Sequence, residues 1–387
     1  MAGKRKLFEE VGSGAQAPAS PAGGLIDGGA RGRGSRGAVR LWLVAIFLLV
    51  AAMIVVGGLT RLTDSGLSIT EWKPVTGALP PMNDADWATE FAKYQASPEF
   101  QLQNSAMSLD QFKSIFWWEW AHRQLGRVIG LVWAVGFFGF LAARRIPPGW
   151  TGRLLGLGAL GGLQGAIGWW MVSSGLKGTM VDVASYRLAT HLGLAFVILG
   201  LTAWYVFLLG RGETELMQAR RAGERKLRGL STGLMHLAFL QIILGALVAG
   251  IDAGRSFPTW PDMNGSFFPA DAFYVPGGGG VWHAFLENPG LVQFNHRLAG
   301  YLLVVLGVVA WTKGRKSAHG ATRAAFHAVM AMLLAQVALG IATALTLAHV
   351  HVAITHQIGA VILWVLILRA RHLSIYPIAG SIREGTA

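Results

Sequence analysis

The sequence predicts an all-α integral membrane protein, with eight transmembrane helices arranged as two duplicated four-helix bundles. Hydrophobic residues make up 53% of the chain and charged residues only 14%. Apolar stretches of about 20 residues, the length that crosses a bilayer, recur along it. Motifs of the first half return in the second half in the same order, which indicates an internal duplication. The stretches lie near residues 41–58, 119–142, 154–173, 187–209, 231–251, 294–312, 326–347 and 353–370.

The distribution of basic residues predicts how these helices are oriented. Most of the 33 Lys and Arg residues lie in the N-terminal arm, the C-terminal tail and alternate loops. Because the cytoplasmic loops of membrane proteins are enriched in Lys and Arg, both termini are expected in the cytoplasm. The net charge of +13 then reflects topology and attraction to anionic membrane lipid. Nucleic acid is not expected as a partner.

The chain divides into five expected segments. Residues 1–39, rich in Gly, Ala, Ser and Pro, are expected to form a disordered basic cytoplasmic arm. An N-terminal four-helix half spans 40–210, a cytoplasmic linker 211–230, a C-terminal four-helix half 231–372 and a cytoplasmic tail 373–387. The chain has no cysteine, which excludes disulfides, iron–sulfur clusters and thiolate ligands.

Four pairs of short motifs relate the two halves. Both copies start on the cytoplasmic side, so they are parallel repeats related by an axis along the membrane normal. The pairs are HRQLG at 122–126 with HRLAG at 296–300, TH at 190–191 with TH at 355–356, Gln164…Gly168 with Gln336…Gly340, and DSGLS at 64–68 with DAGRS at 252–256.

Four of the eleven histidines occupy matching positions in this repeat: His122, His191, His296 and His356. Each is expected within the first two turns of a helix that runs from the outer side inward. Two neutral imidazoles that face each other across a bundle bind a heme iron from both sides. A lone histidine at a helix end is more often an interfacial polar residue, and zinc takes three or four ligands. The repeated pairs therefore favour two bis-histidine heme sites.

Further residues near these histidines suit a porphyrin. Arg123 and Arg297 directly follow two of the histidines, where a guanidinium is able to bind a propionate with two hydrogen bonds. Gln-xxx-Gly patterns on three helices would let a flat ring approach the backbone, although small-residue spacings are also ordinary packing devices in membranes. These patterns begin at Gln164, Gln241 and Gln336.

Glu119 breaks the symmetry between the halves. It precedes His122 by three residues and so shares its helix face, whereas Gln293 holds the matching position before His296. One interpretation is a helix-start carboxylate that pairs with Arg123 four residues later. The other is a carboxylate over a heme edge, where it takes a proton or stabilises positive charge. The asymmetry favours the second interpretation, with one heme as redox cofactor and the other as substrate.

Taken together, the stretches EWAHRQLGR, THLGLA, NHRLAGY and THQIGA resemble the heme A synthase family, and the resemblance covers nearly the whole chain from about residue 40. It implies oxidation of the C8 methyl group of heme O to a formyl group, giving heme A for cytochrome c oxidase. It also implies a heme b cofactor at His296 and His356, substrate heme at His122 and His191, and a catalytic acid at Glu119. The lack of a cysteine pair in the first outer loop fits the cysteine-free branch, typical of alphaproteobacteria and similar to the mitochondrial form.

The resemblance further implies a bacterial inner-membrane protein with its heme sites toward the periplasm. Its expected partners are heme O, the heme O synthase that supplies it, an unidentified electron acceptor and a second copy in a homo-oligomer.

A di-heme b electron-transfer protein, like a quinol dehydrogenase subunit, would also explain four histidines, but not Glu119 opposite Gln293. A heme transporter would need heme-binding residues along a path through the bilayer, whereas all four repeated histidines are expected near the outer side. A prenyltransferase would need aspartate-rich motifs that hold diphosphate through Mg²⁺, which the loops lack.

Overall fold

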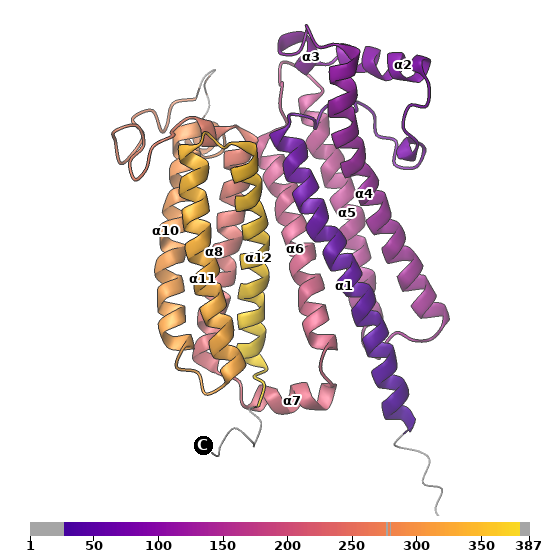
Figure 1. The fold of residues 1–387 in the computed structure, drawn as a ribbon, viewed down its shortest axis with the longest axis vertical. Coiled ribbons are helices and arrows are strands. Elements are labelled where there is room, and N and C mark those ends of the chain that lie inside the picture. The colour runs from indigo at the N-terminus through magenta and orange to yellow at the C-terminus, as the bar shows by residue number, and fades with distance from the viewer. Residues whose placement is uncertain (1–26, 276–277, 279, 380–387) are drawn as a thin grey trace, which may run out of the picture.

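The computed structural model describes residues 27–379 except 276, 277 and 279, and in this part of the chain it is helical without a named strand (Figure 1). Eight helices are long and apolar enough to cross a membrane, which confirms the predicted class of multi-pass α-helical membrane protein. They are α1 (Asp27–Leu62), α4 (Leu109–Ala142), α5 (Thr151–Gly175), α6 (Ser185–Leu209), α8 (Arg225–Gly250), α10 (Pro289–Gly314), α11 (Gly320–Leu345) and α12 (Val350–Ile375). The short helices are η1 (Thr76–Ala78), α2 (Asp84–Gln95), α3 (Pro98–Leu102), α7 (Glu213–Arg221), η2 (Ala253–Arg255) and α9 (Val281–Glu287).

The long helices form two groups that lie side by side (Figure 1). Helices α1, α4, α5 and α6 contact one another in the first group, and α8, α10, α11 and α12 in the second. The groups meet where α6 packs against α8 and α12, and where α1 packs against α12. At this junction Trp364 Nε1 donates to the Phe196 carbonyl oxygen over 3.1 Å, an approach that Gly200 permits because it has no side chain. One continuous apolar core therefore joins both groups.

Helix α1 begins at Asp27, well before the start near residue 41 that hydrophobicity predicts. Extending an existing helix adds one hydrogen bond for each residue ordered, so a long apolar helix readily continues into a polar segment. Arg36 also ties this extension to the α6–α7 connection, donating to the carbonyl oxygens of Leu208 and Arg211 and pairing with Glu213 at 3.0 Å. Residues 27–39 of the expected disordered arm are thus helical, and residues 1–26 lie outside the described part.

Helix α4 begins ten residues before the expected start at residue 119. Ser108 accepts a hydrogen bond from the Gln111 N–H and the Gln111 side chain accepts one from the Ser108 N–H, which forms a capping box. The added turns pack aromatic rings of α4 against α2 and α3 in a cluster around Trp87 and Phe112. His122 therefore lies in the fourth turn of its helix, not in the first two.

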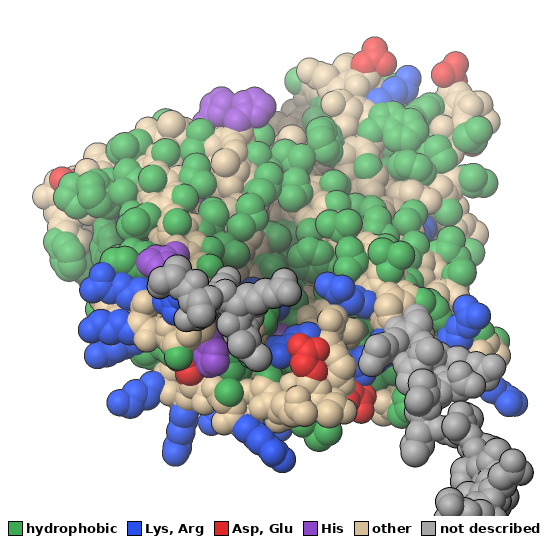
Figure 2. All heavy atoms as spheres, turned by 60° about the horizontal axis from the view of Figure 1, so that its bottom comes forward, with side chains coloured by type: hydrophobic (Ala, Val, Ile, Leu, Met, Phe, Trp, Pro, Cys, Tyr) green, Lys and Arg blue, Asp and Glu red, His purple; other side chains and the backbone are tan. Residues whose placement is uncertain are grey.

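The two ends of the molecule differ in charge. Lys and Arg side chains gather at the end where α7 lies, whereas the middle of the molecule is mainly hydrophobic (Figure 2). Helix α1 begins and α12 ends at this basic end, and α2, α3 and the loop after α8 lie at the opposite, loop end (Figure 1). The expected linker 211–230 is largely helical, comprising α7 and the first turns of α8. Residues 380–387 of the expected tail lie outside the described part.

Candidate heme sites

Each of the four repeated histidines lies against a glycine of a neighbouring helix. All four residues are only partly buried, so part of each remains accessible to a ligand. A methyl group added at any of these glycines would press on the imidazole, so the absence of a side chain makes room for the ring. The distances from such a Cβ to the nearest ring atom are 3.3 Å for Gly57 and His122, 2.8 Å for Gly168 and His191, 3.0 Å for Gly245 and His296, and 3.3 Å for Gly340 and His356.

Glutamines one turn from three of these glycines reach the same histidines. The Gln164 amide nitrogen lies 3.2 Å from His191 Nδ1 and donates to the His191 carbonyl oxygen over 3.0 Å. The Gln241 amide nitrogen lies 3.2 Å from His296 Nδ1. Gln336 donates to the His356 carbonyl oxygen over 3.0 Å. The Gln-xxx-Gly patterns thus place an amide and an open backbone surface beside the same imidazole.

These surroundings fit a heme in each half. The buried amide oxygens of all three glutamines lack a hydrogen-bond partner, as does Nδ1 of His356. Buried polar atoms in native proteins nearly always have partners, so unpartnered atoms around a glycine-lined imidazole indicate room for a bound group. Within each half the two imidazoles lie in electrostatic range, His122 of His191 and His296 of His356. Two such pairs suit bis-histidine ligation of iron.

Glu119 holds the first long loop against α4. Its Oε2 atom accepts hydrogen bonds from Ser68 Oγ and from the Ile69 N–H, each over 2.7 Å. Its Oε1 atom accepts from Arg123 Nε over 3.0 Å and Nη2 over 2.6 Å. Only 2% of Glu119 is exposed, so this is a buried, paired carboxylate. The predicted pair with Arg123 is present, but α4 begins at Leu109, so Glu119 lies well inside the helix and is not the helix-start carboxylate of the first interpretation.

Arg123 and Arg297 bind loop backbone in matching ways. Arg123 donates to the carbonyl oxygens of Ile69 over 2.7 Å and Glu71 over 2.9 Å. Arg297 donates to those of Phe257 over 2.9 Å and Asp262 over 2.8 Å. Each guanidinium thereby fastens the loop that follows the first helix of its half. Because most of their N–H groups are engaged, two-pronged binding of a propionate would need some of these loop bonds to open.

Both of these loops begin with the same kind of backbone turn. Asp64 and Asp252, equivalent in the repeat, both adopt the left-handed conformation, with φ of 49° and 51°. Arg61 joins them across the two halves, at 2.8 Å from Asp64 and 2.9 Å from Asp252, with Asp182 at 3.8 Å. Sequence reasoning missed Arg61 because two of its partners, Asp182 and Asp252, are remote in the chain.

A second buried carboxyl, Glu99 in α3, was also not identified from the sequence. It is 4% exposed and its Oε2 atom has no hydrogen-bond partner. Burial raises the pKa of Glu99 to about 8, so the group is largely protonated at neutral pH. The sequence offered one signal for this residue, since Glu99 lies in a segment with aromatic residues such as Tyr94 and Phe100.

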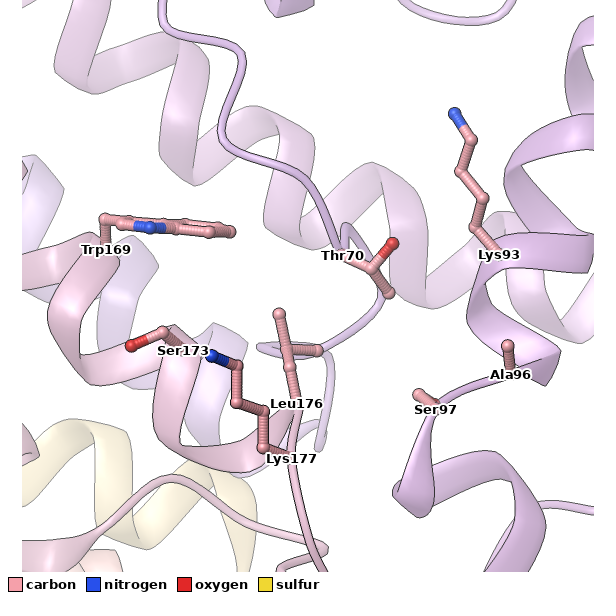
Figure 3. Close-up of a pocket in the computed structure, with 8 residues that line it drawn as sticks. All are labelled: Thr70, Lys93, Ala96, Ser97, Trp169, Ser173, Leu176 and Lys177. Atoms are coloured by element: carbon pink, nitrogen blue, oxygen red, sulfur yellow. The ribbon is translucent and has the colours of Figure 1, made fainter.

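A cavity of about 350 Å³ lies beside the N-terminal pair (Figure 3). The Trp169 ring extends over it, and Trp169 directly follows Gly168, which contacts His191. Thr70 on the opposite wall directly follows Ile69, which binds Glu119. Chain neighbours of residues that contact His191 and Glu119 therefore line the cavity. It is lined by Thr70, Lys93, Ala96, Ser97, Trp169, Ser173, Leu176 and Lys177.

Known proteins resemble this chain over its whole length. It is 65% identical over 389 residues to a heme A synthase of Cereibacter sphaeroides, with 99% of each chain covered. It is 63% identical over 381 residues to the heme A synthase of a Ruegeria species, covering 98% of this chain and 99% of the relative. With the heme A synthase of Dinoroseobacter shibae it shares 61% identity over 391 residues and the full length of both chains. Residues 40–368 match the family COX15-CtaA, described as cytochrome oxidase assembly protein. The chain belongs to this family.

Proposed function

We propose that this protein is a heme A synthase, which oxidises the C8 methyl group of heme O to a formyl group and so supplies heme A for cytochrome c oxidase. The observation that carries the proposal is the asymmetry between two otherwise equivalent histidine pairs. The N-terminal pair has the buried carboxylate of Glu119 one turn from His122, and Gln293 replaces it beside His296. The full-length similarity to heme A synthases supports the same activity.

In this proposal the C-terminal half holds a heme b through His296 and His356, and this cofactor supplies electron transfer when bound. The N-terminal half binds heme O as substrate through His122 and His191. Gly57 and Gly168 leave room for the two imidazole rings. Arg123 and Arg297 fasten the loops that cover each half, and either would bind a propionate with two hydrogen bonds only after some of these loop bonds open.

Glu119 acts in this proposal as the residue that accepts a proton or stabilises positive charge beside the substrate methyl group. Ser68, Ile69 and Arg123 keep its carboxyl group oriented, because each donates a hydrogen bond to it. The cost of burying this group is offset by these donors. The same bonds keep the loop closed over the substrate side of the site.

The proposal places the protein in the bacterial inner membrane, with both termini in the cytoplasm and the heme sites toward the periplasm. The gathering of Lys and Arg at the end where α1 begins and α12 ends supports this orientation. The heme O synthase and an electron acceptor are its expected partners.

The test is heme extraction with chromatography and mass detection, after co-expression with a heme O-forming enzyme. The wild type is expected to yield heme A and Glu119→Ala to yield heme O. Heme A from both proteins would keep the synthase and limit Glu119 to holding the loop. Heme b alone from a folded wild type with confirmed heme O supply would refute the synthase and favour a di-heme b electron-transfer protein.

A further inference from the structure

The surroundings of His122 differ from those of the other three repeated histidines in one residue, which the sequence patterns do not reveal. The repeat aligns Gly57 with Gly245, and therefore Met53 with Gln241, one turn earlier on each helix. The packing agrees with this alignment. A Cβ at Gly300, four residues after His296, would lie 3.4 Å from the Gln241 amide nitrogen. A Cβ at the equivalent Gly126, four residues after His122, would lie 3.4 Å from Met53 Cε.

His122 is consequently the one repeated histidine without a glutamine beside it. The amides of Gln164 and Gln241 lie 3.2 Å from Nδ1 of His191 and His296. Gln336 donates only to the His356 carbonyl oxygen, and Nδ1 of His356 has no hydrogen-bond partner. Among the described residues, none forms a hydrogen bond with the His122 ring. A methionine thioether has no hydrogen to donate and is a weak acceptor, so Met53 only fills space where an amide stands elsewhere.

Hydrogen-bonding groups behind a metal-binding imidazole fix its orientation and tune its strength as a ligand. Losing such a group typically lowers metal affinity by about 10- to 100-fold. His122 would therefore be a weaker iron ligand than His296, its equivalent in the other half, whose ring lies beside the Gln241 amide. It is also the ligand one helix turn from Glu119.

We propose that Met53 sets the residence time of heme in the N-terminal half, by leaving His122 without a hydrogen-bonding amide. This inference rests on the proposed function, in which the N-terminal half must take up a substrate heme and release its product. A resident cofactor does not need to leave its site, and in the C-terminal half the Gln241 amide lies beside the His296 ring. Met53 is thus a positioning residue whose exchange for glutamine distinguishes a transient heme site from a permanent one.

The test is the transfer of heme from the purified full-length protein to excess apomyoglobin, followed by absorbance. The wild type is expected to lose heme in a fast and a slow phase. Met53→Gln is expected to slow the fast phase by about 10-fold or more and to leave the slow phase unchanged. The reciprocal variant, Gln241→Met, is expected to accelerate only the slow phase. A fast phase that Met53→Gln leaves unaltered, or a single phase in the wild type, would overturn the inference.

Met53→Leu is the matched control, because leucine keeps the apolar volume without the sulfur atom. It is expected to release heme as the wild type does. Faster loss of heme from this variant would identify the thioether itself as a ligand and refute the inference. The transfer rates do not depend on catalysis. If the chain carries only heme b, the proposed function fails, but the two phases of heme release still test the role of Met53. If heme A forms and Met53→Gln leaves the phases unaltered, only the role of Met53 is rejected.

Discussion

Ser68 Oγ donates a hydrogen bond of 2.7 Å to Glu119 Oε2, although the two residues lie 51 positions apart. The same oxygen accepts from the Ile69 N–H. A carboxylate proposed to act on the substrate is therefore also the anchor of the first long loop. The two roles are separable, because they depend on different properties of Glu119, its charge and its hydrogen-bond geometry.

Replacing Glu119 by Gln tests the charge, since Gln293 shows that an amide is compatible with the same position in the other half. We expect heme A formation to fall by about 100-fold or more, the range typical of a lost acid–base group. Ser68→Ala is the control, which removes one bond to the carboxylate and should cost about 1 kcal/mol of stability. Heme A yield and thermal unfolding in detergent measure both effects. Equal losses of heme A in the two variants would indicate that loop position, and not carboxylate chemistry, limits the reaction.

Arg61 is expected to stabilise the junction of the two halves. Arg61→Gln leaves Asp64, Asp182 and Asp252 close together without their shared cation. We expect the free energy of unfolding to fall by about 1 to 2 kcal/mol, more than for an exposed pair because only 14% of the Arg61 side chain is exposed. The effect should be larger at pH 8 than at pH 5, because protonation of Asp182, whose pKa is raised, relieves its repulsion with its neighbours at the lower pH.

Arg255→Gln is the matched control for Arg61. Arg255 lies 3.9 Å from Asp252, and 46% of its side chain is exposed. A change within about 0.5 kcal/mol is expected, as for other surface substitutions. Burial raises the pKa of Asp182, and Arg61 opposes this shift. If the two variants unfold at the same temperature at both pH values, the proposed inter-half role of Arg61 is wrong.

Glu99 should make stability depend on pH. Its pKa is about 8 in the folded protein, because of burial, and close to 4.5 in the unfolded chain. Between these values the folded state binds the extra proton, so stability should fall as the pH rises from about 5 to about 8 and then level off. Glu99→Gln, which mimics the protonated form, should remove this component and raise the unfolding temperature at pH 8 relative to wild type. Parallel wild-type and Glu99→Gln curves from pH 5 to pH 9 would disprove the assignment.

The contact of α12 with α1 depends on one glycine. Gln357 donates to the Ile54 carbonyl oxygen over 2.6 Å, and a methyl group at Gly58 would collide with the Gln357 amide. Gly58→Ala should therefore lower the free energy of unfolding by about 1 to 3 kcal/mol, as is usual for overpacking. Gly161→Ala in α5, where a Cβ has open space, is the control and should be neutral or slightly stabilising. Gly58→Ala combined with Gln357→Ala should recover part of the loss, and no recovery would exclude this contact as the cause.

The sequence by itself determined the membrane class, the eight spans and the family. These follow from apolar length and from motifs, which are local properties of the chain. Helix starts were less predictable. Neither the capping box at Ser108 nor the contacts of Arg36 is marked by a change in hydrophobicity. The Gln-xxx-Gly patterns identified three of the four glycines that contact histidines. The fourth, Gly57, has Met53 and not a glutamine four positions earlier, so it escaped the pattern.

Only the tertiary structure decided what each candidate residue contacts. It joined Glu119 to Ser68, Arg61 to Asp252 and Gln357 to Ile54, pairs separated by 51, 191 and 303 positions. It also placed Met53 where Gln241 stands in the other half. Hydrophobicity specifies that a helix crosses the membrane, but it leaves open which helix lies next to it. In a bilayer, close packing and hydrogen bonds between helices choose the neighbour, and these forces act only once the helices have assembled.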